Sequence, residues 1–184
     1  MTAQGQKTNV PFAAPPASAV SKYIAQLTLT PKTKPAVRAR MQQEIERLTS
    51  LCAGEVVAVR DSVIACVIVP SACLFAGGDT AVSDAGKILL EKLLPPAPTA
   101  CRIVVAVHTD DTGTPDYLQQ LSDRRAESVA AFFAAAGMEV AALGRGAGEP
   151  LALNDTYRGR ETNRRTEIYF IPADAKARRA ARRR

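Results

Sequence analysis

The sequence has no tryptophan, only 5% aromatic residues and a single histidine. With 47% hydrophobic residues among 184, it can still bury a core of Leu, Val, Ile, Ala and Phe, enough for one domain with an appendage. No apolar run approaches the roughly 18 residues that a membrane-spanning helix needs. The four cysteines show no C-x-x-C spacing, so we predict no metal site and no cofactor. A buried free thiol is expected at Cys66, and the spacing leaves open which other cysteines, if any, form a disulfide.

The net charge of +6 comes from one end of the chain. The last nine residues, KARRAARRR, hold six basic side chains, and the remainder holds 18 basic against 18 acidic residues. A basic tail of this kind adheres weakly to any polyanion, whereas a nucleic-acid-binding domain gathers its charge on a folded face. We therefore expect no specific nucleic-acid partner.

The beginning of the chain shows no export signal. Residues 1–20 are polar and then rich in Pro and Ala, which predicts a disordered leader. They lack the charged start and the apolar middle of roughly 7–15 residues that a signal peptide has. From these residues alone, a cytoplasmic location and a location reached after removal of a signal both stay open.

The rest of the chain is predicted to form a helical N-terminal segment (21–54), an α/β domain (55–171) and a basic tail (172–184). A helix is expected from about residue 35 to 52, because apolar residues recur there at helical spacing, and Gly54 is well placed to end it. Two short strands should follow, on either side of a turn at Arg60-Asp61.

Helices and strands then alternate. A helical pattern lies within 80–96, the strand CRIVVAV follows, and a second helix is expected from an N-cap at Asp116, with Gln119 as its capping-box partner, to Gly137. Residues 138–150 predict a short piece and a glycine-rich turn, 151–163 a polar loop, and RRTEIYFIP the final strand. The order β-β-α-β-α-β predicts an α/β sandwich with helices packed on a mixed sheet, preceded by the N-terminal helix.

The most informative stretch runs from the strand CRIVVAV into the following helix. Asp110 stands just past the carboxyl end of that strand, where ligands of α/β sheets tend to bind. Arg125 interrupts the apolar stripe of the helix between Leu121 and Val129. A carboxylate and a guanidinium that face one pocket suit a zwitterionic amino-acid head group. The same two residues could instead form structural salt bridges, and spacing alone leaves both interpretations open.

An enzyme or a metal site has less support. His108 has Asp110 and Asp111 beside it but no second clustered ligand, so a hydrogen-bonded structural histidine is expected. Ser122 has no partnered base in the sequence, and GRGAGEP matches neither a nucleophile elbow nor a phosphate-binding loop. We therefore predict a binding protein rather than an enzyme.

Several spaced motifs resemble the OmpA-like peptidoglycan-binding domain, which also occurs in the peptidoglycan-associated lipoprotein and the flagellar stator B subunit. They are HTDDTG followed by LSDRRAESV, then GRGAGEP and NDTYRGRETNRRTEI, and upstream LFAGGDTAVSDAGKILLEKL. The resemblance covers roughly residues 55–171 and agrees at several motifs at once.

The resemblance implies non-covalent binding of peptidoglycan, without catalysis, through the meso-diaminopimelate of the stem peptide. Carried over by position, Asp110 would take the ligand's ammonium, Arg125 its carboxylate, and Arg164 would be a secondary contact. The residues implied to shape the loop, so that its backbone faces the ligand, are Thr109, Thr112 and Gly113. The resemblance further implies that the chain anchors a partner or a membrane to the wall, in the cell envelope and facing the periplasm, with the cytoplasm as the alternative location.

Three positions depart from the family's usual pattern. Val107 stands where Gly usually precedes His-Thr-Asp, Leu118 where a polar Asn is usual, and Ala147 where Glu is commoner. That Asn commonly helps hold the loop or the ligand, so its loss would weaken the site. The rival hypothesis is a degenerate domain that acts as a protein-protein scaffold in an envelope or secretion complex, with segment 21–54 as the partner surface. A third is electrostatic adhesion through residues 176–184, which predicts steep salt dependence.

Overall fold

The computed structural model of the chain describes residues 35–51, 56–59, 64–96 and 101–172. The predictions for the leader, for Gly54, for the turn at Arg60-Asp61 and for the basic tail beyond residue 172 fall outside these ranges.

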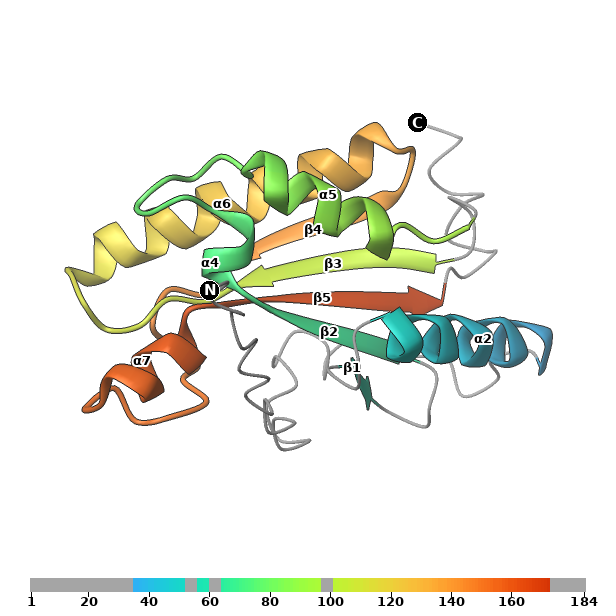
Figure 1. Ribbon diagram of the computed structural model, residues 1–184, viewed down its shortest axis with the longest axis horizontal. Helices are drawn as coiled ribbons and strands as arrows, with labels where there is room; N and C mark the ends of the chain where they lie inside the picture. The colour runs from blue at the N-terminus through green and yellow to red at the C-terminus, as the bar shows by residue number, and fades with distance from the viewer. Residues whose placement is uncertain (1–34, 52–55, 60–63, 97–100, 173–184) are drawn as a thin grey trace, which may run out of the picture.

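Five strands form one mixed sheet in the order β1-β2-β5-β3-β4 (Figure 1). Their bounds are β1 Val56–Val59, β2 Ile64–Pro70, β3 Cys101–Val107, β4 Glu139–Gly144 and β5 Arg165–Pro172. Neighbouring strands are antiparallel except β3 and β4, which run parallel. The predicted α/β class with a mixed sheet is therefore confirmed. The predicted order β-β-α-β-α-β did not count the short piece after the second helix, which forms the edge strand β4.

Five helices are described, with the bounds α2 Pro35–Leu51, α4 Ser71–Leu74, α5 Asp84–Leu93, α6 Pro115–Ala135 and α7 Tyr157–Asn163. The predicted N-terminal helix is confirmed as α2. The expectation of an unbroken polar loop over 151–163 is wrong, because α7 occupies its second half. The helix starts there because the Thr156 side chain caps it, accepting a hydrogen bond from the Gly159 N–H at 3.0 Å.

The predicted N-cap of α6 is also wrong. Thr114 is the N-cap, its hydroxyl oxygen accepting from the Tyr117 N–H at 3.3 Å, and Pro115 rather than Asp116 opens the helix. Proline suits that first position because it has no N–H to satisfy. Gln119 is no capping-box partner, since its Nε2 donates to Asp123 Oδ1 (2.9 Å) and to the Gly144 carbonyl (3.0 Å). Gly137, with φ of 80°, ends the helix as predicted.

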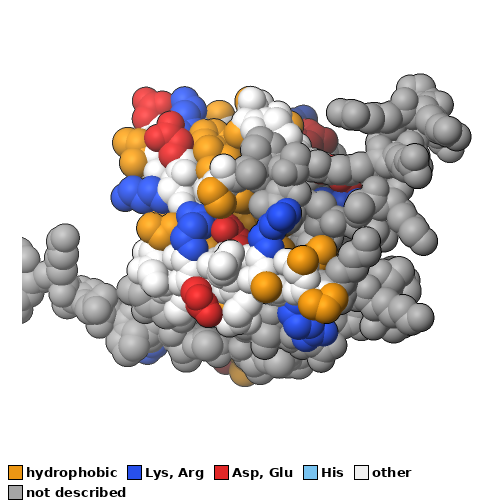
Figure 2. All heavy atoms as spheres, turned by 90° about the vertical axis from the view of Figure 1, so that its right-hand side faces the viewer, with side chains coloured by type: hydrophobic (Ala, Val, Ile, Leu, Met, Phe, Trp, Pro, Cys, Tyr) orange, Lys and Arg blue, Asp and Glu red, His pale blue; other side chains and the backbone are white. Residues whose placement is uncertain are grey.

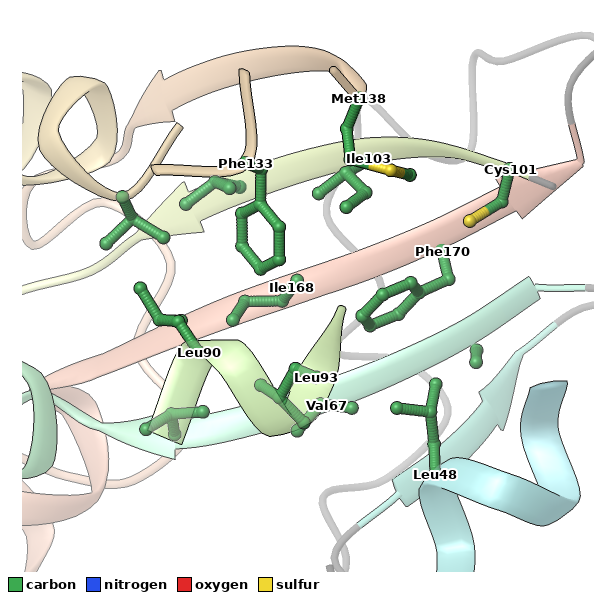
Figure 3. Packing of buried hydrophobic residues seen from close by; sticks show 14 of the residues in the cluster. Leu48, Val67, Leu90, Leu93, Cys101, Ile103, Phe133, Met138, Ile168 and Phe170 are labelled. Carbon is green, nitrogen blue, oxygen red and sulfur yellow. The ribbon is translucent and has the colours of Figure 1, made fainter. Parts of the chain in front are cut away.

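One face of the sheet carries the main core (Figure 3). Helices α2, α5 and α6 point apolar side chains at alternate residues of β2, β3 and β5, and Leu48, Leu90 and Phe133 are fully buried there. Since α2 contributes to the same core, its apolar stripe packs against this sheet. The labelled residues of Figure 3 are Leu48, Val67, Leu90, Leu93, Cys101, Ile103, Phe133, Met138, Ile168 and Phe170.

The opposite face of the sheet holds a second apolar cluster of strand residues, which includes Cys66, Val104 and Tyr169. Cys66 is buried as predicted, and burial raises the pKa of its thiol well above the ordinary value. Arg165 and Glu167 of β5 point to the same face, because residues two apart on a strand share a side. Both are 1% exposed, so this face contains a buried ion pair beside its apolar residues.

Candidate functional site

The antiparallel pairing of β3 with β5 brings the candidate residues together. Val107, the last residue of β3, pairs with Thr166 near the start of β5. The segment that leaves β3 therefore lies beside the segment that enters β5, and the His108 N–H donates to the Arg165 carbonyl at 2.9 Å. This end of the sheet, where α7 and the start of α6 also lie, is at the left of Figure 1. Asp110 and Arg164, far apart in the sequence, meet here.

Asp110 is held by two contacts. Its Oδ1 accepts from the Thr112 N–H at 3.0 Å, and its Oδ2 accepts from Arg164 Nη1 at 2.5 Å. Burial alone would raise the pKa of this carboxyl, but the Thr112 hydrogen bond and the Arg164 guanidinium outweigh burial and lower the pKa of Asp110 from its ordinary value. The side chain is 9% exposed, so it is an ionised carboxylate in a largely desolvated place.

Arg125 lies on the buried face of α6, as its position in the apolar stripe predicts, and is 6% exposed. Its Nε donates to the Asp79 carbonyl at 2.8 Å and its Nη2 to the Gly77 carbonyl at 3.0 Å, while the guanidinium stacks 4.7 Å from the Phe75 ring centroid. Burial lowers the pKa of Arg125 from its ordinary value, with Tyr117 and Asp79 opposing that shift. Asp110 is thus ion-paired with Arg164 and not with Arg125.

The loop after β3 is ordered by its own backbone and hydroxyl groups. The Thr109 N–H donates to the Gly146 carbonyl at 2.9 Å, and the Thr109 hydroxyl donates to the Asp110 carbonyl at 2.8 Å. Gly113 has φ of 143°, in the region that favours glycine, and Thr112 and Gly113 are both exposed. The loop therefore presents its outer half to solvent while Thr109 fixes its base.

Two buried polar residues, to which the sequence motifs assign no role, support this loop cluster. The Ser122 hydroxyl accepts from the Gly146 N–H (2.9 Å) and donates to the Gln119 carbonyl (2.8 Å), which ties α6 to the turn after β4. Asn163, fully buried, accepts from two N–H groups of the loop before α7 through Oδ1 and donates through Nδ2 to the Ala152 carbonyl. Their polar character in a buried setting is the signal that could have found them.

His108 belongs to a buried cluster on the second face of the sheet. It is 1% exposed, and its Nε2 lies 3.5 Å from Glu167 Oε1. Glu167 also accepts from Arg165 Nε at 2.7 Å and from the Tyr169 hydroxyl. Within the described ranges, no group of three or more His, Cys, Asp or Glu residues could hold a metal ion.

The end of the molecule opposite the candidate site has a mixed surface. Figure 2 shows basic, acidic and apolar side chains of the described residues interspersed there, without a patch of a single charge. None of the helices in the described parts of the chain combines the length and apolar character needed to cross a bilayer.

These features define a small α/β domain that gathers charged loops at one end of a mixed sheet. Residues 74–164 match the model of the OmpA family, so this part of the chain is a domain of that family. The resemblance of the sequence motifs is thereby confirmed. Val107 and Leu118, where the chain departs from the family's usual residues, are both buried apolar side chains here.

The chain is similar to the outer-membrane lipoprotein YfiB of Pseudomonas aeruginosa, with 50% identity over 70 residues, 36% of this chain and 41% of that one. It is also similar to outer membrane protein A of Bordetella avium, with 39% identity over 72 residues, 38% of this chain and 37% of that one. The chain thus spans about two fifths of the length of these relatives.

Two solved structures share the fold. The cell wall anchor of the type VI secretion system from Pseudomonas aeruginosa is 28% identical, with a TM-score of 0.58 over 74% of this chain and 99% of that one. A MotB-like protein from Desulfovibrio vulgaris, 23% identical, has a TM-score of 0.61 over 76% of this chain and 95% of that one. OmpA-like domains generally bind peptidoglycan, work within envelope complexes and are structural anchors rather than enzymes.

Proposed function

We propose that this chain binds peptidoglycan non-covalently through the meso-diaminopimelate of the stem peptide. Asp110 accepts hydrogen bonds from the ligand's ammonium, Arg125 grips its carboxylate, and Arg164 is a secondary contact. The observation that carries the proposal is a largely buried carboxylate and a largely buried guanidinium that each keep hydrogen-bonding capacity, in a domain of a peptidoglycan-binding family.

The hydrogen-bonding sites that Asp110 and Arg125 leave unused can be counted. A carboxylate has about four lone-pair sites, and Asp110 uses one for Thr112 and one for Arg164. A guanidinium has five N–H groups, and Arg125 donates two of them to the carbonyls of Gly77 and Asp79. The remaining sites match a ligand that brings an ammonium and a carboxylate on one carbon atom. Because the Arg125 fork is already fixed by the two carbonyls, little rotamer entropy is lost when it grips an anion.

The loop residues have supporting roles in this proposal. Thr109 anchors the loop to Gly146, and Thr112 orients the Asp110 carboxylate. Gly113 allows the chain to turn without a side chain, so that backbone groups of the loop can face the ligand. The pocket thus offers polar groups that are preorganised for a small zwitterion.

Through this binding, the chain anchors a membrane or a protein partner to the wall on the periplasmic side of the envelope, and it performs no catalysis. Relatives such as YfiB and outer membrane protein A are proteins of the outer membrane, which supports the proposed location. In the described part of segment 21–54, the surface open to a partner is the exposed side of α2, since Met41, Ile45 and Leu48 are buried against the sheet.

Isothermal titration with two tripeptides tests the ligand assignment, one ending in meso-diaminopimelate and the other in lysine. Lysine keeps the side-chain ammonium but lacks the carboxylate that Arg125 is proposed to grip. We expect the wild-type chain to bind the diaminopimelate peptide about tenfold or more tightly than the lysine peptide, as for a charge-assisted bidentate contact. Equal affinities for the two peptides would show that the carboxylate is not recognised.

One set of contacts favours a second candidate, a scaffold with an unused pocket. Asp110 is already paired with Arg164, Arg125 is already bonded to two carbonyls, and Leu118 replaces the Asn that usually helps hold the loop or ligand. A scaffold would bind neither tripeptide, and Asp110→Ala would leave assembly with its protein partner intact.

A further inference from the structure

The described residues expose five large apolar side chains, and three of these lie on the segments that carry the candidate pocket. They are Leu51, Ile88, Tyr117, Leu153 and Tyr157. The three on these segments are Tyr117, Leu153 and Tyr157. Tyr117 lies in the first turn of α6, and Tyr157 is the first residue of α7. Both helices begin at the end of the sheet where Asp110 lies (Figure 1). Exposed tyrosines are enriched where proteins bind other molecules, because the ring offers rigid apolar area and a polar tip.

Tyr117 lies beside the loop that follows β3 and carries Asp110. Its side chain is next to the loop glycine, since a Cβ added at Gly113 would lie 3.2 Å from Tyr117 Cδ1. The residue is nevertheless 53% exposed, so part of its ring surface is open to a ligand.

Tyr157 borders the Arg164 side. Its hydroxyl donates to Glu161 Oε1 at 2.9 Å, one helical turn later, which fixes the direction of the side chain. The Arg164 guanidinium carbon lies 5.9 Å from the Tyr157 ring centroid, and Arg164 in turn binds Asp110. With 66% of the residue exposed, Tyr157 offers a held ring beside the pocket.

We propose that Tyr117 and Tyr157 form an aromatic rim that stacks against pyranose rings of the glycan strand. This inference rests on the proposed function, since a stem peptide seated at Asp110 brings along the sugars to which it is covalently linked. The flat faces of hexopyranose rings present C–H groups, which pack against the electron-rich face of a tyrosine. The pocket would then bind the peptide while the rim binds the sugar.

The test compares two ligands, a disaccharide-tripeptide with terminal meso-diaminopimelate and the same tripeptide without sugars. The readout is the ratio of the two affinities for each variant, so that any loss common to both ligands cancels. We expect wild type to favour the sugar-bearing ligand, and Tyr117→Ala and Tyr157→Ala each to reduce that preference about threefold to tenfold. Tyr→Phe at either position keeps the ring and should retain the preference, as should Ile88→Ala, which removes exposed apolar surface on α5.

Two results would overturn the aromatic rim. If wild type binds both ligands equally, or if the alanine variants keep the full preference for the disaccharide-tripeptide, the rim does not bind sugar while peptide binding stands. If wild type binds neither ligand, the proposed function fails and the rim fails with it.

Discussion

Replacing Arg125 by alanine is expected to lower the affinity for the diaminopimelate tripeptide about a hundredfold. The substitution removes the proposed partner of the ligand carboxylate and leaves that charge unpaired in a largely desolvated pocket, which costs roughly 2–5 kcal/mol in buried charge pairs. Isothermal titration at one fixed salt concentration measures the change. Arg125→Lys, which keeps the charge but not the planar fork, should recover only part of the affinity.

The matched control for this loss is Arg124→Ala. Arg124 is the neighbouring residue on α6 and is exposed, so the variant makes the same change in charge and side-chain volume outside the pocket. Because Arg125 also holds the carbonyls of Gly77 and Asp79, circular dichroism should first show that Arg125→Ala is folded at the titration temperature. Equal losses in the two variants would mean that only long-range charge matters, and an unchanged Arg125→Ala would remove Arg125 from the site.

Glu167→Gln is expected to destabilise the fold by about 3 kcal/mol at neutral pH and to flatten its acid dependence. Burial alone would raise the pKa of Glu167, but His108, Arg165 and Tyr169 together lower it from 4.5 to about 2. A folded-state pKa below the unfolded one means that the stabilisation is complete above about pH 4.5 and is lost as the pH falls toward 2. Urea unfolding between pH 3 and 7 measures this dependence.

Glu127→Gln supplies the comparison, because Glu127 is an exposed carboxylate on α6. That variant should follow the wild-type curve, since a surface charge of this kind contributes little to the free energy of unfolding. If Glu167→Gln loses stability toward low pH as steeply as wild type does, the buried Glu167 cluster is not what links folding to acid pH.

Much of the fold could be predicted because its elements carry local signals. The apolar run of β3 and the helical stripe of α6 each reflect burial within one element, so periodicity finds them. Periodicity also identifies Arg125, since a charged residue in an apolar stripe breaks the pattern. The N-cap of α6 is hard to assign from the sequence because Asp116 and Thr114 are both good N-caps, and only the placement of Pro115 at the first helical position decides between them.

The partners of the site residues could not be predicted, because they come from elements far apart in the sequence. The carbonyls of Gly77 and Asp79 that hold Arg125 belong to the backbone, which has no residue signature. The pairing of Asp110 with Arg164 depends on the register of β3 against β5, in which Val107 faces Thr166. Helix α7 was missed because its seven residues are polar and show no apolar stripe.

The measurement that tests the central proposal most directly is co-sedimentation with purified sacculi of the diaminopimelate type at moderate salt. Wild type is compared with Asp110→Asn, Arg125→Ala and a chain lacking residues 176–184, and Asp111→Asn serves as the matched control on the exposed neighbouring residue. Asp110→Asn keeps an oxygen that can accept from the Thr112 N–H, so the loop should hold while the charge is lost. We expect wild type, Asp111→Asn and the shortened chain to pellet with the sacculi while both pocket variants stay in solution. Wild type that stays in the supernatant, or pelleting that is lost only with residues 176–184, would contradict binding through this pocket.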